Sequence, residues 1–371
     1  MNQIPQTLTK DEQVNLMLEG LFESYGYRKF KMRKFEQYSL YEEYKSFLTS
    51  EYVLTFHSPD GKLMALRPDV TLSIVKNTRA DEQNTDKVFY RENVYRMDRH
   101  SKEFREIPQA GVELIGNVDS LATLEIVRMA KESLSMIDSN SILCLSHMGF
   151  TEGLLTACNV MSSDVRSRFL AYVASQNVHD LRLMLGDSIP SEEWIDGLSA
   201  VLSSQGTYAE TLALARKIAV NDQMSEALDE LEKIGFSLSA LDMAEGIRLD
   251  FTMQNDLSYY NGVLMQGYVE KYPGILLTGG RYDRLLTKFH KNLSAIGFAL
   301  ALGELNSCYP NRPDCDADVL LIYGPEMNIN TVFAQAEAMR REGKRVRLAT
   351  EMPREFTAKK VIDLREEDQR C

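Results

Sequence analysis

Cysteine and histidine are scarce in this chain of 371 residues, which holds five of each. The cysteines lie far apart and form no C-x-x-C pair, and the histidines are equally scattered. A structural zinc site needs its ligands at close, paired spacings, and a disulfide framework is typical of short chains dense in cysteine. We therefore expect no metal, no cofactor, and reduced cysteines as in a cytoplasmic protein.

Long apolar runs are also absent, since none approaches the ~20 residues that a membrane helix requires. The N-terminal residues lack a basic stretch followed by an apolar one, so we expect neither secretion nor a membrane span. The formal net charge of −12 disfavours a general attraction to nucleic-acid phosphates. One basic stretch with interleaved aromatic residues, YRKFKMRKF at 27–35, is compatible with a local contact to nucleic acid. An edge strand with a solvated face explains it better.

Helix and strand patterns alternate in the first part of the chain. Thr9 and Glu12 form a capping box before an apolar stripe at helical spacing, and Gly26 ends this predicted helix. Further helices are predicted over 71–77 and from Asp119 or Ser120 to about Met136. Strand patterns lie at 28–36, 52–57, 62–66, near 87–96 and at 105–115, and the turn signal SPDG joins the second and third.

From about 148 to 246, leucine, alanine and methionine at helical spacing predict a helical insertion. Strand patterns return at 247–254, 259–269 and 275–278, and an apolar helix is predicted from about Ala295. Strands interrupted by helices indicate an α+β fold with an antiparallel sheet, rather than a succession of βαβ units. A linker at 309–318 then leads us to expect a core domain over 1–310 and a short C-terminal α/β module over 316–371.

Polar side chains recur where these predicted strands end or turn. In REIPQAGVELIG, an extended chain places Gln109, Gly111 and Glu113 on one face and aliphatic side chains on the other. The glycine leaves room for a small polar ligand between the two hydrogen-bonding groups. Asp69 and Thr71 follow a predicted strand in LRPDVT. Two acids and an amide of this kind are suited to holding an ammonium group.

Each of these groups also has a plainer explanation. Asp69 stands where a cap for the helix over 71–77 belongs, and Glu113 is able to pair with an arginine. Tyr259 and Tyr260 point to opposite sides of an extended chain, so we expect at least one of them to be a core residue. TGGRYDRLL resembles a phosphate loop but lacks the Lys-Ser/Thr ending, so we exclude that function.

Taken together, these pieces resemble the catalytic core of histidyl-tRNA synthetases, which have the class II aminoacyl-tRNA synthetase fold. LRPDVT is similar to that family's LRPEGT, and VYRMD with FREIPQAGVE resembles its motif 2. DLSYYN resembles its RGLDYYN, GGRYDRLL its GGRYDGL, and AIGFALALGEL its motif 3, AVGFAxGLERL. The resemblance covers roughly residues 9–307, and the combination is far more specific than any single piece.

The resemblance implies a pocket for histidine. The family's histidine-binding positions fall on Asp69, Thr71, Gln109, Glu113, Tyr260 and Tyr282. By this resemblance the first three bind the α-amino group, the next two hold the imidazole edges, and Tyr282 lines the pocket. In this interpretation Gly111 makes room for the ligand.

The chain departs from the family's pattern at positions that serve adenylation. The arginine of RGLDYY falls on Asn255, the motif 3 arginine on Glu304 and the motif 1 proline on Arg33. Groups that stabilise developing negative charge are each worth about 10²–10³ in rate, and a carboxylate repels phosphates. Arg96 and Arg105 of motif 2 are kept as possible phosphate or ligand contacts. We therefore expect an amino-acid-binding chain with no catalytic residues that does not charge tRNA.

Such a core resembles the regulatory subunits of ATP phosphoribosyltransferase. The resemblance implies a chain that joins the short catalytic subunit in a hetero-octamer containing a homodimer of the core. It further implies that the chain is required for activity in the first step of histidine biosynthesis and mediates feedback inhibition by L-histidine, with neither nucleic acid nor membrane as a partner. Two alternatives stay open: a divergent stand-alone ligase that forms an aminoacyl-adenylate, and a diverged histidyl-tRNA synthetase.

Overall fold

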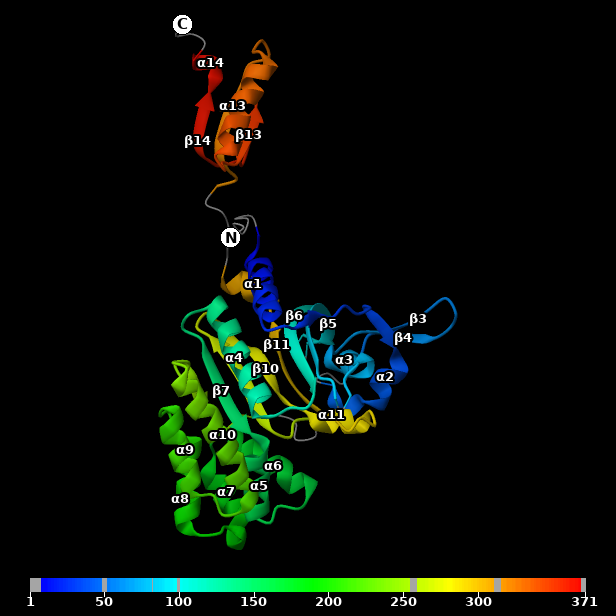
Figure 1. The fold of residues 1–371 in the computed structure, drawn as a ribbon, viewed down its shortest axis with the longest axis vertical. Coiled ribbons are helices and arrows are strands. Elements are labelled where there is room, and N and C mark those ends of the chain that lie inside the picture. The colour runs from blue at the N-terminus through cyan, green and yellow to red at the C-terminus, as the bar shows by residue number, and fades with distance from the viewer. Residues whose placement is uncertain are drawn as a thin grey trace. The chain divides into compact units, whose positions relative to one another are not determined.

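A sheet of eight strands forms the centre of the larger of two units into which the chain divides (Figure 1). The structure is a computed structural model that describes residues 8–48, 52–81, 83–98, 101–253, 259–309 and 315–367. The larger unit comprises residues 11–309, and the smaller comprises residues 310–371 together with residues 1–10.

The large sheet is antiparallel in its centre and parallel at both edges. In spatial order its strands are β1 (Arg28–Lys29), β5 (Asp86–Met97), β6 (Phe104–Gly116), β11 (Ser294–Ala301), β10 (Tyr272–Arg281), β9 (Val263–Val269), β7 (Ile142–His147) and β8 (Ile247–Leu249). The predicted antiparallel sheet is thus confirmed for the five pairings between β5 and β7.

Two long helices cover one face of this sheet, α1 (Lys10–Ser24) and α4 (Ser120–Ile137). Gly26 follows α1 with φ of +79°, a conformation that suits glycine at a helix end. Asp119 caps α4, because its carboxylate accepts a hydrogen bond of 2.8 Å from the backbone N–H of Ala122. The alternating side chains of β11 bury Phe298 against Phe22, with ring centroids 6.0 Å apart.

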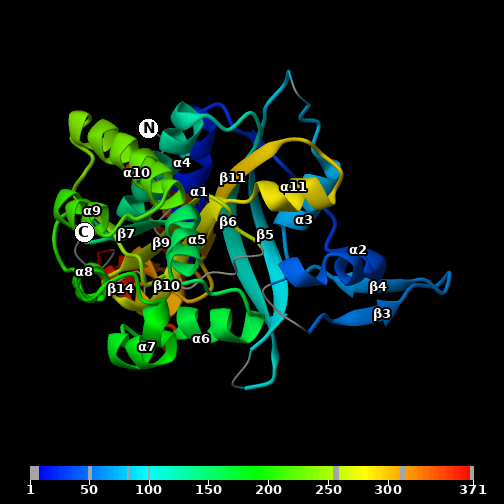
Figure 2. The ribbon, with the colours of Figure 1, turned by 90° about the horizontal axis from the view of Figure 1, so that it is seen from below.

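The opposite face carries the smaller elements of this unit. They are α2 (Tyr38–Glu43), the 3₁₀ turn η1 (Lys45–Phe47), α3 (Thr71–Asn77) and α11 (Asp283–Lys288), together with a second sheet of β2 (Phe35–Gln37), β4 (Leu63–Leu66) and β3 (Thr55–His57). The hairpin of β3 and β4 extends away from the large sheet in Figures 1 and 2. A separate hydrophobic cluster lies under these elements, with Leu72, Ile74 and Leu285 at its centre.

Six helices lie within the range over which the helical insertion is predicted. They are α5 (Met148–Ala157), α6 (Ser163–Ala174), α7 (Val178–Leu185), α8 (Glu192–Leu202), α9 (Tyr208–Lys217) and α10 (Asp222–Ala240), with the 3₁₀ turn η2 (Gly186–Ser188) after α7. The capping box of Thr207 and Glu210 opens α9. The insertion packs against β7 and against β8, the edge strand of the sheet (Figure 1). The sequence patterns did not reveal β7.

Several predicted elements differ in the structure. The apolar helix expected from Ala295 is the strand β11, and a short helix, α12 (Leu305–Cys308), follows it. The predicted strand over 28–36 is two short strands, because the buried guanidinium of Arg67 holds the carbonyl of Arg33 at 2.9 Å and keeps the chain out of the sheet. The predicted strand over 247–254 is confined to β8, and that over 259–269 begins only at Val263.

The smaller unit contains a parallel sheet in the order β13 (Val346–Ala349), β12 (Ala317–Ile322) and β14 (Ala358–Asp363). Its helix α13 (Ile329–Arg341) packs Val332 and Ala336 against Val319 and Leu321 of β12, and α14 (Leu364–Glu367) ends the described chain. Part of the predicted linker, residues 310–314, lies outside the described residues. Among the described helices of both units, none has the length and apolar character needed to cross a membrane.

Candidate functional site

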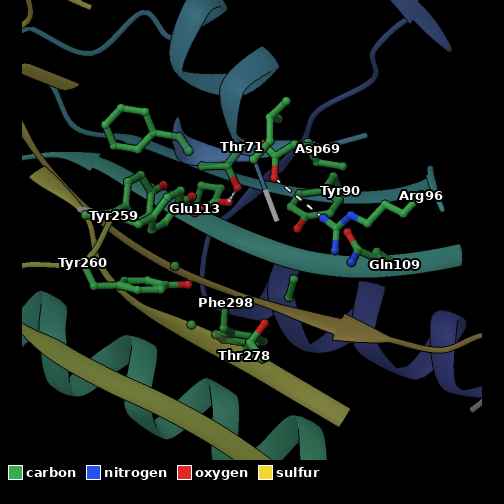
Figure 3. A pocket seen from close by; sticks show the side chains of 17 residues that line it. Asp69, Thr71, Tyr90, Arg96, Gln109, Glu113, Tyr259, Tyr260, Thr278 and Phe298 are labelled. Atoms are coloured by element: carbon green, nitrogen blue, oxygen red, sulfur yellow. Dashed lines mark hydrogen bonds and ion pairs between the residues drawn. The ribbon is translucent and has the colours of Figure 1, made fainter. Parts of the chain in front are cut away.

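A cavity of about 210 Å³ lies between the large sheet and the elements on its second face (Figure 3). Its walls come from β5, β6, β10 and β11, from the start of α3, and from Tyr259, Tyr260 and Tyr282. The volume is below the 300–1,000 Å³ range of typical drug-sized pockets. The cavity is therefore suited to a small metabolite.

Glycines permit the close packing around this cavity. In the register of β6 and β11, Gly297 lies opposite Glu113, and a Cβ atom at 297 would collide with the Glu113 carboxylate. A Cβ at Gly111 would lie 2.6 Å from the hydroxyl of Tyr90. The room left by Gly111 is thus taken by Tyr90, and the interpretation that it opens space for a ligand is wrong.

Glu113 is buried in the wall of the cavity, and each of its carboxyl oxygens accepts one hydrogen bond. The Thr71 hydroxyl donates to Oε1 at 2.8 Å and the Tyr282 hydroxyl donates to Oε2 at 2.5 Å. The pKa of Glu113 is raised to about 8, chiefly by burial and less by nearby Asp69, while the two hydroxyl donors lower it. The raised pKa favours the protonated form of this carboxyl group near pH 7.

Asp69 caps the first turn of α3 and also lies beside a cation on β5. Oδ1 accepts a hydrogen bond of 2.8 Å from the N–H of Leu72 in the first turn of α3, as the capping explanation predicts. Oδ2 lies 3.8 Å from Nη2 of Arg96, whose Nε donates to the carbonyl of Pro68 at 2.8 Å. Burial raises the pKa of Asp69 and the Arg96 guanidinium opposes this shift. Figure 3 shows this pair at one side of the cavity.

Tyr259 and Tyr260 both line the cavity, and both also pack, partly buried, against the hydrophobic cluster on this face of the sheet. The two residues precede β9 and are not extended strand, which lets their rings meet edge to face with centroids 4.6 Å apart. Tyr259 also lies 5.7 Å from the ring of Tyr282. Burial, with the neighbouring Glu113 and Asp69, raises the pKa of Tyr260, so its phenol stays protonated.

The structure brings together all but one of the predicted site residues. Those that line the cavity are Asp69, Thr71, Arg96, Gln109, Glu113, Tyr260 and Tyr282. Arg105 does not line it. Its guanidinium is about half exposed and lies 3.6 Å from Asp98 and 3.9 Å from Glu304. Asn255, where the family has an arginine, lies outside the described residues.

Tyr90 is a site residue that the sequence patterns missed. It is 1% exposed, lines the cavity and pairs with Gly111 across β5 and β6. Within the described residues, the side chains of Tyr90, Gln109 and Tyr260 make no hydrogen bond to another protein group. All three line the cavity, where their hydroxyl and amide groups are available to a polar ligand. The signal that identifies Tyr90 is the pairing of a tyrosine on one strand with a glycine on the next.

The groups that line the cavity are suited to binding a small molecule. It offers two carboxyl groups, one guanidinium and several phenols to a small molecule with both charged and aromatic parts. Among the described residues, no three histidine, cysteine, aspartate or glutamate side chains are placed to hold a metal ion.

Comparison with known proteins matches residues 2–305 to the family model of histidyl-tRNA synthetase. The chain is 23% identical over 365 residues to an ATP phosphoribosyltransferase regulatory subunit of Oceanobacillus iheyensis, covering 96% of this chain and 89% of that protein. It is 28% identical over 314 residues to the regulatory subunit of Alkaliphilus metalliredigens, covering 81% and 78% of the two chains.

Solved structures give the same picture of the fold. A protein of Bacillus halodurans, described as an ATP phosphoribosyltransferase regulatory subunit/histidyl-tRNA synthetase, superposes with a TM-score of 0.77 at 22% identity and covers 98% of this chain and 96% of its own. Histidyl-tRNA synthetase of Nostoc gives 0.74 at 14% identity, covering 100% and 89%. The ATP phosphoribosyltransferase complex of Thermotoga maritima gives 0.62 at 17%, covering 81% and 98%. The predicted α+β class II fold is confirmed, and the chain belongs to the histidyl-tRNA synthetase family.

Proposed function

We propose that this chain is the regulatory, non-catalytic subunit of an ATP phosphoribosyltransferase and that it binds L-histidine in the cavity. One observation carries the proposal: the residues that the family resemblance assigns to histidine line one cavity, whereas Arg105 lies outside it and is paired with Glu304. The names of the similar proteins from Oceanobacillus iheyensis and Alkaliphilus metalliredigens support this function. The likeness to the Thermotoga maritima complex supports a catalytic transferase subunit as the partner.

The groups around the cavity suit the two ends of histidine. The ammonium group is proposed to lie near Asp69, Thr71 and Gln109, where a carboxylate, a hydroxyl and an amide oxygen accept hydrogen bonds. The imidazole ring is proposed to lie against Tyr260 and Glu113. We further propose that Tyr282 lines the ring and that Arg96 contacts the ligand's carboxylate.

Adenylation is disfavoured by the charges beside the cavity. ATP brings several negative charges, and Glu304 and Asp98 both lie within 4 Å of the Arg105 guanidinium. The two acids compensate the cation that would stabilise phosphate charge, and stabilisation of this kind is usually the largest single contribution to catalysis. We therefore propose that the chain regulates its partner without catalysing a reaction of its own.

Regulation requires only that histidine binds one state of the assembly better than another. A difference of about 1–3 kcal/mol in binding free energy gives 5- to 150-fold inhibition. By resemblance, we propose a homodimer of the core over 1–310 within a cytoplasmic hetero-octamer. This assembly also contains the module over 316–371 and the short catalytic subunit. Neither nucleic acid nor a membrane is a partner.

The proposal is tested by mixing the purified chain with the short catalytic subunit of the same organism. Phosphoribosyl transfer to ATP is measured while L-histidine is titrated. We expect activity that depends on the mixture and falls with histidine. Gln109→Ala should keep the activation and lose most of the inhibition. A matched control is Gln223→Ala, since Gln223 bonds Glu152 in the helical insertion and lies outside the cavity. It should behave as the parent chain.

The same proteins separate the alternatives. If the catalytic subunit is unaffected by a folded chain, the proposal is wrong. Histidine-dependent exchange of pyrophosphate into ATP would then favour a stand-alone adenylating ligase, and transfer of histidine to tRNA would favour a synthetase.

A further inference from the structure

We propose that Glu113 and the imidazole of the bound ligand share a single proton, so that the cavity selects a weakly basic aromatic ring and responds to pH as well as to histidine. The inference rests on the proposed function, because it takes histidine as the ligand. It adds the protonation state of the ligand and of its binding group, which the function alone leaves open.

The hydrogen bonds of Glu113 leave space for one more partner. A carboxylate has about four lone-pair sites, and the hydroxyls of Thr71 and Tyr282 occupy one on each oxygen. Gly297 lies opposite on β11, where any side chain would displace the carboxylate. The group is thus held in place on the cavity wall with acceptor capacity remaining for a ring N–H.

The charged and titratable groups that face Glu113 come from each element packed around the cavity. They are Asp69 before α3, Tyr90 and Arg96 on β5, Tyr259 and Tyr260 before β9, and Tyr282 before α11. Burial raises the pKa of each of these phenols, which stay neutral. The cation Arg96 lies 3.8 Å from Asp69 and compensates that carboxylate instead. Glu113 is therefore buried without a cation of its own.

A buried carboxyl group without a cation keeps its proton, in line with the pKa of about 8. The imidazole of histidine has an ordinary pKa of about 6.5 and is mostly neutral at pH 7. Near neutral pH, Glu113 and the imidazole therefore carry one titratable proton between them. A protonated Glu113 together with an imidazolium would carry two. A protonated Glu113 that donates to a bare ring nitrogen, and an imidazolium that donates to the carboxylate, are the same pair with the proton on either side.

This count fixes how affinity depends on pH. Below about pH 6.5 both separated groups are protonated, so forming a pair with one proton releases one and affinity rises with pH. Above about pH 8 neither Glu113 nor the ring is protonated, so binding takes up one proton and affinity falls with pH. Each limb approaches tenfold per pH unit, since one proton is exchanged. The strongest binding is expected between the two pKa values.

The test compares two ligands by titration calorimetry on the full chain at about pH 5.5, below the pKa of imidazole. Each titration is run in two buffers of different ionisation enthalpy, which gives the number of protons exchanged. The ligands are L-histidine and its 1,2,4-triazole analogue, whose ring is a far weaker base. Histidine should release about one proton more than the analogue. The two ligands share the ammonium and carboxylate groups, so any titration of Asp69 or of the ligand's amino group cancels.

Equal proton release by the two ligands would overturn the shared proton while leaving histidine binding, and with it the proposed function, intact. Absence of histidine binding at pH 7 would instead contradict the proposed function.

A conservative variant gives a second test. Tyr282→Phe removes a donor to the ionised Glu113, so the alkaline limb should move to higher pH. Tyr208→Phe, which loses a hydroxyl bond to Leu231 in the helical insertion, should leave the limb in place. An alkaline limb that does not move in Tyr282→Phe also overturns the inference.

Discussion

Arg105 and Glu304 form an ion pair from neighbouring strands of the large sheet, with Nη1 and Oε1 3.9 Å apart. Arg105 is near the start of β6, and Glu304 follows the end of β11. By resemblance, Glu304 occupies the position of the motif 3 arginine of histidyl-tRNA synthetases. Position 304 thus carries a negative charge in this chain, where the synthetases carry a positive one. In this chain the negative charge pairs with Arg105, a motif 2 arginine.

Replacing Glu304 should increase affinity for ATP. Glu304→Arg removes a carboxylate from Arg105 and adds a second cation, and each exposed charge pair at 4 Å is worth about 1 kcal/mol in water. We expect ATP to bind about three- to tenfold more tightly to the variant, with Glu304→Gln intermediate, by equilibrium dialysis. Tight ATP binding by the parent chain, unchanged in both variants, would refute the role given to this ion pair.

The free energy of unfolding should depend on pH because Glu113 titrates at a different pH in the folded and unfolded states. Its pKa is raised to about 8 in the fold, against about 4.3 for an unfolded glutamate. The folded state binds more protons between these values, so the parent chain loses stability as pH rises through this window.

Glu113→Gln lacks this titration. Its free energy of unfolding relative to the parent should therefore increase with pH, by up to about 1.4 kcal/mol per unit. Urea unfolding at about pH 5.5, 7 and 8.5 measures the difference. The exposed control Glu226→Gln should give a constant difference. A constant difference for Glu113→Gln as well would contradict the burial argument.

Arg67 should be among the most important single residues for stability. It is 0% exposed, and its guanidinium bonds Glu92 at 2.8 Å and the carbonyls of Arg33 and Asn93 at 2.9 Å. Arg67→Met would leave these acceptors without a partner, at a cost of about 3–5 kcal/mol. The control Arg182→Met loses partly exposed ion pairs to Glu192 and Asp196 and should change stability by less than about 1 kcal/mol. If denaturant unfolding shows a similar loss in the free energy of unfolding for both variants, this role for Arg67 is wrong.

Gly297→Ala should damage the cavity. The added methyl would meet the Glu113 carboxylate, so either the carboxylate or β11 must shift. Overpacking of this kind costs about 1–3 kcal/mol, and histidine should bind at least about tenfold more weakly because Glu113 is displaced. Gly20→Ala in α1 is the control, since a methyl there meets nothing within 4 Å and alanine favours helix. Normal histidine binding by Gly297→Ala would show that the carboxylate has room to move.

Local patterns predicted much of the fold. The helix over 71–77 and the cap at Asp119 were found because capping and helical spacing act within a few residues. The motif 3 strand was missed, since Ala295 to Ala301 is uniformly apolar or small and fits a buried helix equally well. Pairing with β6 and β10 on either side decides for the strand, and those partners are distant in sequence.

For the site, the sequence motifs by themselves identified seven polar residues that line the cavity: Asp69, Thr71, Arg96, Gln109, Glu113, Tyr260 and Tyr282. The tertiary structure alone decided that Tyr90 fills the space above Gly111, that both Tyr259 and Tyr260 reach the cavity, and that Arg105 pairs with Glu304 outside it. The physical reason is that register, burial and the pairing of charges depend on strands far apart in the chain. A pKa of about 8 for Glu113 follows from that burial and from no property of its neighbours in sequence.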